Sequence, residues 1–181
     1  MKMKLIADDK GLMCPNCSGL GFVQTGTMQD GSLTCKDCNQ SFLIKNAVPS
    51  LINVKSENYK SKKEITDFWK HLYHAAYKDH ENIDDRDIFI DRLKNLEELF
   101  QHREHLAVTE MPIENIEGKK VLEIGCVAGA HSSLFSLKGA KMTALDITLD
   151  RAHSASTKLN LLDISGNSFG VHGDAEKLPF Q

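Results

Sequence analysis

The sequence predicts an α/β protein built from three consecutive segments, residues 1–53, 54–117 and 118–181. The first segment holds two C-x-x-C pairs set among short strand patterns that glycines interrupt. The second has the apolar spacing of two amphipathic helices. The third alternates strand, helix, strand, helix, strand. This β-α-β-α-β order forms half of a doubly wound parallel sheet.

The composition is typical of a globular protein in an aqueous compartment, with 41% hydrophobic and 26% charged residues and a formal net charge of -3. No apolar run approaches the ~20 residues that a membrane span needs. The N-terminus lacks the apolar core of a secretory signal. We therefore predict a cytoplasmic protein without a membrane partner. Residues 1–80 carry a small excess of basic residues, which permits contact with phosphate groups but is more common on a solvated surface.

Four of the five cysteines form two close pairs, Cys14 with Cys17 and Cys35 with Cys38, with 17 residues between the pairs. A two-residue gap lets both thiolates of a pair reach one ion, and Zn²⁺ favours four thiolates at tetrahedral corners. A redox pair would instead need one cysteine at the start of a helix. The pattern therefore predicts a structural zinc site in a small zinc ribbon, with the metal supplying much of the folding free energy.

Two helices are predicted in the second segment. Residues 61–64 match a capping box, with Ser61 at the N-cap and Glu64 reaching back to it. A second helix is expected to begin at Asp84 or Asp85, with Pro112 marking its end region. Trp69 and Tyr73 could pack in the core or roof a cofactor pocket. One stripe of the first helix is apolar, comprising Ile65, Phe68, Trp69, Leu72, Tyr73 and Ala76.

The third segment has strand patterns at 120–124, 141–146 and 169–172. The first helix is expected to end near Gly139 and the second to begin after Thr148. In such a unit a ligand binds at the carboxyl ends of the strands. The inner face of the second helix is predicted to comprise Leu149, Ala152, Ala155, Leu159 and Leu162.

The residues at these strand ends predict an adenosine cofactor. A glycine loop at 125–129 lets the backbone approach a ligand closely, and Asp146, about 20 residues on, can accept hydrogen bonds from two ribose hydroxyls. Glu123 lies where a carboxylate would attract the ammonium of a methionine moiety and repel a pyrophosphate. The spacing Gly125-x-x-x-Gly129 also differs from the dinucleotide pattern G-x-G-x-x-G.

The motifs at 121–126, 129–132, 144–148 and 173–180 resemble those of class I S-adenosylmethionine-dependent methyltransferases. The resemblance covers residues 118–181 and implies a Rossmann-like methyltransferase half-sheet that binds S-adenosylmethionine. It implies that Asp174 bonds the adenine amino group, where the alternative is a loop cap, and that the Ala175 amide lies at the adenine ring. The implied cofactor-binding residues are Glu123, Gly125, Cys126, Gly129, Asp146, Ile147, Asp174 and Ala175.

The first segment has its own resemblance. The two cysteine pairs followed by residues 47–51 are similar to the zinc ribbon that precedes some bacterial methyltransferases, including ribosomal RNA guanine methyltransferases. This resemblance covers about residues 10–53. The methyl acceptor is left open between RNA, a small metabolite and a protein, and no catalytic base can be named from these residues.

The sequence departs from the methyltransferase pattern in two ways, and these departures bear on cofactor binding and on self-association. Val127 replaces the usual middle glycine, and a β-branched residue tolerates positive φ poorly. The family's fourth to seventh strands would follow Gln181, so we expect a truncated form with one edge of strand 121–124 unpaired. Such an edge favours a homodimer or other self-association; alternatively, helices between 61 and 107 could cover it. The chain is then either a methyltransferase or a non-catalytic scaffold that binds zinc and S-adenosylmethionine.

Overall fold

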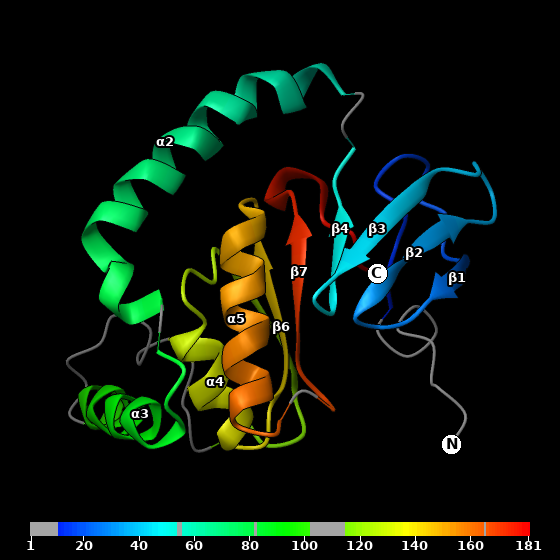
Figure 1. Cartoon of the computed structure of the whole chain (residues 1–181). Coiled ribbons are helices and arrows are strands. Elements are labelled where there is room, and N and C mark those ends of the chain that lie inside the picture. The colour runs from blue at the N-terminus through cyan, green and yellow to red at the C-terminus, as the bar shows by residue number, and fades with distance from the viewer. Residues whose placement is uncertain (1–10, 54–55, 82, 102–114, 165) are drawn as a thin grey trace.

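The computed structural model describes residues 11–53, 56–81, 83–101, 115–164 and 166–181. These residues form an α/β structure with one seven-stranded mixed sheet, in the order β1-β2-β3-β4-β7-β6-β5 (Figure 1). No helix among them is long and apolar enough to cross a membrane. The strands are β1 (Phe22–Gly26), β2 (Asp30–Cys35), β3 (Ser41–Lys45), β4 (Val48–Leu51), β5 (Lys120–Ile124), β6 (Lys141–Asp146) and β7 (Phe169–Gly173).

The antiparallel half of the sheet, β1 to β4, contains the predicted ribbon strands. Side chains alternate along β3, with Phe42 and Ile44 buried and their neighbours exposed, as expected of strands with one covered face. Phe22 of β1 contacts Phe42 edge to face, with ring centroids 6.2 Å apart. On the outer face, hydroxyls pair across the strands, as Thr25 with Ser32 at 2.8 Å.

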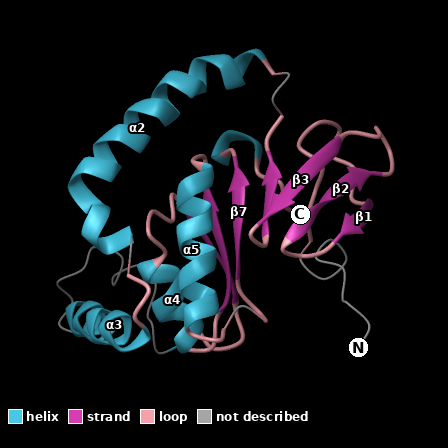
Figure 2. Cartoon of the chain, in the orientation of Figure 1, coloured by secondary structure: helices cyan, strands magenta, loops and turns pink. Residues whose placement is uncertain are grey.

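The parallel half, β5 to β7, carries its helices on one side (Figure 2). Helix α4 (Ala130–Leu137) connects β5 to β6, and α5 (Leu149–Leu161) connects β6 to β7. These elements occupy the segments that the sequence predicts. Gly139, at φ +87°, follows the C-cap of α4 as expected. The predicted inner face of α5 is buried at Ala152, Ala155, Leu159 and Leu162.

The two halves meet where β4 pairs in parallel with β7. Ser50 lies opposite His172 and Leu51 opposite Gly173. One hydrophobic core spans the junction, because buried side chains of the ribbon contact those of the parallel strands. That core includes Leu12, Phe22, Leu33, Phe42, Ile44, Leu51, Leu145, Phe169 and Val171.

Helix α2 (Glu57–Glu81) begins earlier than predicted. The expected N-cap at Ser61 is wrong, because Ser61 lies inside the helix. Ser56 is the cap: its Oγ accepts a hydrogen bond from the backbone N–H of Tyr59 at 3.2 Å. The predicted apolar stripe is largely exposed at Ile65, Phe68, Trp69 and Leu72. Core packing of Trp69 is therefore not observed. The side chains of Tyr73 and Ala76 lie outside the described residues.

Helix α3 (Arg86–Gln101) starts where the sequence predicts. The Asp85 carboxylate caps it by accepting from the amides of Asp87 at 2.9 Å and Ile88 at 3.0 Å. Pro112, the expected end marker, lies outside the described residues. The buried face of α3 joins a second core with α4 and β6, formed by Ile83, Phe89, Leu93, Phe100, Ile116, Leu134, Phe135, Ala140, Met142 and Leu162.

Strand β5 ends the sheet and, among the described residues, pairs only with β6. Its side chains on the face opposite the helices remain accessible: Leu122 is 36% exposed and Ile124 54% exposed. The helices thus leave an apolar strand at the margin of the sheet.

We predict that Gly170→Ala destabilises the fold by about 2 kcal/mol, since overpacking a close contact costs this order of free energy. A Cβ on Gly170 of β7 would lie 2.5 Å from the carbonyl oxygen of Ala152 in α5. The matched control is Gly166→Ala, where a Cβ would meet no atom within 4 Å. Urea unfolding measures both variants. Equal stability of the two would contradict the close helix–strand packing.

Candidate functional site

The four paired cysteines converge at one point of the ribbon. Their Sγ atoms all lie within 4.8 Å of one another. The Cys14–Cys38 Sγ distance is 3.7 Å and the Cys17–Cys35 distance 3.6 Å. Four thiolates at roughly 2.3 Å from one Zn²⁺ would be about 3.8 Å apart. The donor atoms and their spacing fit a structural zinc site.

The two cysteine turns have the same backbone geometry. The amide of Ser18 donates to the Cys14 carbonyl at 2.8 Å, and that of Asn39 donates to the Cys35 carbonyl at 3.0 Å. Ser18 and Asn39 both have positive φ, 63° and 56°. Asparagine adopts this conformation readily, but serine does so less often. The C-x-x-C spacing indicated the turns, but nothing in the sequence marked Ser18.

The thiols of this cluster differ in environment. Burial raises the pKa of Cys14 to about 12. A hydrogen bond with the Asn16 side chain lowers the pKa of Cys38 to about 6. A buried thiol such as Cys14 gives up its proton readily only when a cation replaces it, because burial penalises an isolated charge. The environment of Cys14 therefore suits a metal ligand better than a free nucleophile.

A second group of polar residues lies at the carboxyl ends of β5, β6 and β7. Asp146, the last residue of β6, is only 7% exposed. Its Oδ1 accepts from the amide of Thr148 at 2.8 Å, and its Oδ2 from the amide of Val127 at 3.3 Å. Burial raises the pKa of Asp146. A carboxylate can accept about four hydrogen bonds, so capacity for ligand hydroxyls remains.

The glycine loop after β5 is anchored to β6. The amides of Gly125 and Cys126 both donate to the Leu145 carbonyl, at 2.8 and 3.1 Å. Gly125 has φ +76°, and a Cβ there would meet nothing within 4 Å, so this position borders open space. Gly129 has a packing role as well: at φ +80°, its Cβ would lie 2.6 Å from the Ala155 Cα in α5.

Val127 has a positive φ, the conformation that a β-branched residue tolerates poorly. Its φ is +49°, in the left-handed region. A β-branched residue there stores strain of about 1 kcal/mol or more. The strained residue donates its amide to Asp146, so the distortion lies within the candidate site.

Glu123 is held by the first turn of α4. The Ser132 hydroxyl donates to Glu123 Oε2, and His131 Nδ1 lies 3.4 Å from Oε1. Ser132 is fully buried. Both partners lie in the motif at 129–132, but the sequence predicts no role for either of them. Glu123 therefore carries fixed partners rather than lying free at the strand end.

Two of the predicted cofactor-binding residues, Cys126 and Ile147, form hydrogen bonds within the protein through their backbone groups. The Cys126 side chain is 2% exposed and packs with Ala144 and Ala155. Burial raises its pKa well above the usual range, so the thiol stays protonated. The Ile147 carbonyl accepts a hydrogen bond from His172 Nε2 at 3.1 Å. Neither side chain is placed to react with a ligand.

Asp174 follows β7 and has two partners. Its Oδ1 accepts from the Glu176 amide at 3.0 Å and so caps the short 3-10 helix η3 (Ala175–Lys177), as the loop-cap alternative expects. Its Oδ2 accepts from Lys62 Nζ at 2.6 Å. Lys62 belongs to α2 and is far away in sequence, so local patterns carried no signal for it. Ala175 is the exposed first residue of η3.

His172 links the ribbon to this edge. The Ser50 hydroxyl in β4 donates to His172 Nδ1 at 2.7 Å, and Nε2 donates to Ile147. Burial lowers the pKa of His172 to about 4, so the ring is neutral at neutral pH. The neutral ring accepts on one side and donates on the other, which matches both partners.

Comparisons with known proteins add no relative: no family model matches the chain, and a search of curated proteins finds no match.

We predict that purified protein contains about one equivalent of zinc by elemental analysis. The four thiolates explain this, because together they satisfy the tetrahedral preference of the ion. Cys38→Ser should lose most of the metal, while Cys126→Ser, which changes a thiol outside the cluster, should keep it. Less than about a third of an equivalent in fresh, unchelated protein would contradict the site.

Proposed function

We propose that this chain is the cofactor-binding part of an S-adenosylmethionine-dependent methyltransferase, joined to a structural zinc ribbon. One observation supports this above the others: Glu123, Asp146 and Asp174 lie at or just after the carboxyl ends of three neighbouring parallel strands, around a glycine loop. Ligands of parallel α/β sheets bind at this end.

Each carboxylate suits one part of the cofactor. Asp146 has hydrogen-bonding capacity for the two ribose hydroxyls. Glu123 would attract the ammonium of the methionine moiety, and Gly125 borders the open space beside it. Asp174 would accept from the adenine amino group, with the Ala175 amide at the ring. When bound, S-adenosylmethionine supplies an electrophilic methyl group.

A dinucleotide is less suitable at this site. A pyrophosphate next to the glycine loop would face Glu123, which Ser132 and His131 hold in place. Like charges at short range are strongly unfavourable where water is partly excluded. The fixed carboxylate therefore favours a cationic ligand over a phosphate.

The contribution of the chain to transfer would be binding and orientation. Holding the methyl group in line with an acceptor nucleophile can supply much of a rate enhancement. No described residue is assigned as a catalytic base. The acceptor class stays open between RNA, a small metabolite and a protein.

The second candidate is a scaffold that binds zinc and cofactor without transferring a methyl group. The observation that favours it is the positive φ of Val127, which places strain inside the cofactor loop. Strain at this position is expected to weaken cofactor binding.

We predict that the chain binds S-adenosylhomocysteine weakly, with a dissociation constant above the micromolar level, and that Val127→Gly binds it about five-fold more tightly because glycine relieves the strain. Asp146→Asn should bind less tightly than wild type, whereas Asp91→Asn on the surface of α3 should match it. Calorimetry measures all four. Sub-micromolar binding by wild type would contradict the strain argument, and no binding even by Val127→Gly would contradict the proposed function.

We also propose that two copies associate through the edge of β5 that no described strand pairs with. An unpaired edge of an apolar strand presents N–H and C=O groups that a second strand can satisfy. A two-fold axis would let two edges pair with each other. The exposed Leu122 and Ile124 would be buried in the same contact.

We predict a dimer at micromolar concentration by light scattering on a sizing column, and a monomer for Ile124→Lys. The matched control is Val23→Lys on β1, at the opposite margin of the sheet, where the side chain is 50% exposed against 54% for Ile124. That control should remain dimeric. A wild-type monomer across the micromolar range excludes the dimer. A dimer that survives Ile124→Lys contradicts the edge assignment.

A further inference from the structure

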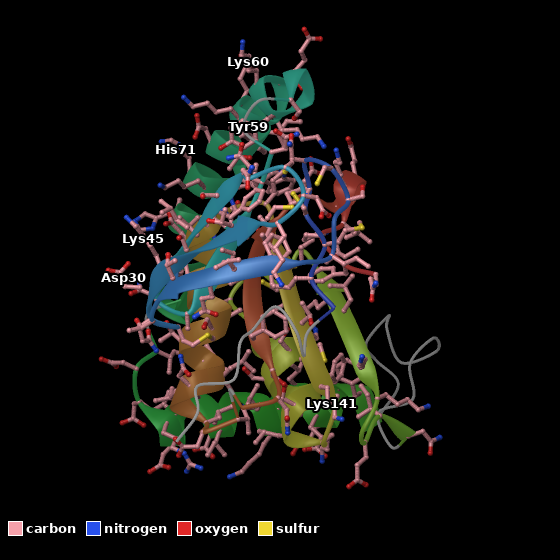
Figure 3. All side chains as sticks on the ribbon, turned by 90° about the vertical axis from the view of Figure 1, so that its right-hand side faces the viewer. Asp30, Lys45, Tyr59, Lys60, His71 and Lys141 are labelled. Atoms are coloured by element: carbon pink, nitrogen blue, oxygen red, sulfur yellow. The ribbon has the colours of Figure 1, made fainter. Side chains whose placement is uncertain are left out.

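Helix α2 crosses the end of the sheet where the parallel strands finish. In Figure 1 it arches from above β4, over the end of β7, toward α3. In the quarter-turn view of Figure 3, Tyr59 and Lys60 of α2 lie at the top, whereas Lys141, at the start of β6, lies near the bottom. The helix therefore passes over the strand ends that carry the candidate cofactor residues.

Two lysines connect α2 to that edge. Lys62 Nζ donates to Asp174 Oδ2 and to Glu176 Oε2, both at 2.6 Å. Lys70 Nζ lies 3.0 Å from Asp150 Oδ2 in the first turn of α5. The side chain of Lys62 is 12% exposed and that of Lys70 57%. Water screens the first contact less, so Lys62 is the stronger of the two tethers.

We propose that α2 is a lid over the cofactor site, and that Lys62 keeps it closed by occupying the oxygen of Asp174 that the ligand needs. This inference rests on the proposed function, which assigns Asp174 to the adenine amino group. Oδ1 of Asp174 is engaged by the Glu176 amide at 3.0 Å. Oδ2 is the oxygen that a ligand would approach, and the Lys62 ammonium lies against it.

The chemistry of the two donors makes Lys62 a competitor. A charged ammonium binds a carboxylate more strongly than a neutral amino group does. Oδ2 has a second lone pair, so adenine competes with the Lys62 ammonium for the approach to this oxygen, and the ion pair weakens adenine binding there. Glu176 offers Lys62 a second acceptor, and its side chain is 72% exposed. Lys62 can keep this outer partner while it releases the inner one.

The proposed lid, held closed by the contact between Lys62 and Asp174 and called the gate below, is tested by calorimetry with S-adenosylhomocysteine on the full chain. Lys62→Ala should bind about five-fold more tightly than wild type, because the competing ion pair is removed. Lys63→Ala, which removes an equal charge from the adjacent exposed residue, should leave the affinity unchanged. The increase in affinity caused by Lys62→Ala should also be absent when the substitution is made in an Asp174→Asn background. Unchanged or weaker binding by Lys62→Ala overturns the gate.

A second readout needs no ligand. Trp69 of α2 is the only tryptophan of the chain, so its fluorescence anisotropy reports the mobility of this helix. The anisotropy should fall in Lys62→Ala and stay at the wild-type value in Lys63→Ala. Unchanged anisotropy in Lys62→Ala overturns the tether. If the tether is seen but neither wild type nor Lys62→Ala binds the ligand, the proposed function fails, and the gate with it.

Discussion

The pairing of β4 with β7 is the contact on which the rest of the structure depends. It joins an antiparallel ribbon to a parallel sheet through two residue pairs, Ser50 with His172 and Leu51 with Gly173. The core beneath it contains side chains from both sides. Most of that core comes from the ribbon, and a metal held by the four cysteines would add to its folding free energy. Asp174 directly follows β7, so the candidate metal site and the candidate cofactor site belong to one continuous sheet.

At the other end of the site, a hydrogen bond connects the Val127 amide to the Asp146 carboxylate. Burial opposes ionisation of Asp146, while two backbone amides favour the charged form. One of those amides belongs to Val127, which reaches Asp146 from a strained conformation. The hydrogen bond to a carboxylate offsets part of the strain. The loop is thus held in place by the carboxylate that we assign to the ribose.

Local patterns in the sequence were sufficient for the cysteine pairs, for β5, β6 and β7 and for the helix end at Gly139, but they did not predict β4. Each depends on residues close together in the chain, such as two cysteines two residues apart. Contacts between distant segments could not be predicted in the same way. Lys62 and Asp174 are 112 residues apart, and Ser50 and His172 are 122 apart. The cap at Ser56 was missed because Ser61–Glu64 matches the capping-box pattern, yet helix propensity continues through it.

The charge distribution at the strand ends connects these features. Glu123, Asp146, Asp174, Glu176 and Asp150 gather acidic groups at one edge of the sheet, and α2 brings Lys62 and Lys70 toward it. An acidic edge of this kind repels phosphate and attracts cations. S-adenosylmethionine has one net positive charge, from a sulfonium and an ammonium against one carboxylate, which suits an acidic edge. In the closed arrangement, Lys62 provides that charge from within the chain. Under the proposed lid, the ion pair between Lys62 and Asp174 stabilises the ligand-free protein, and it sets the free energy that a ligand must exceed to open the lid.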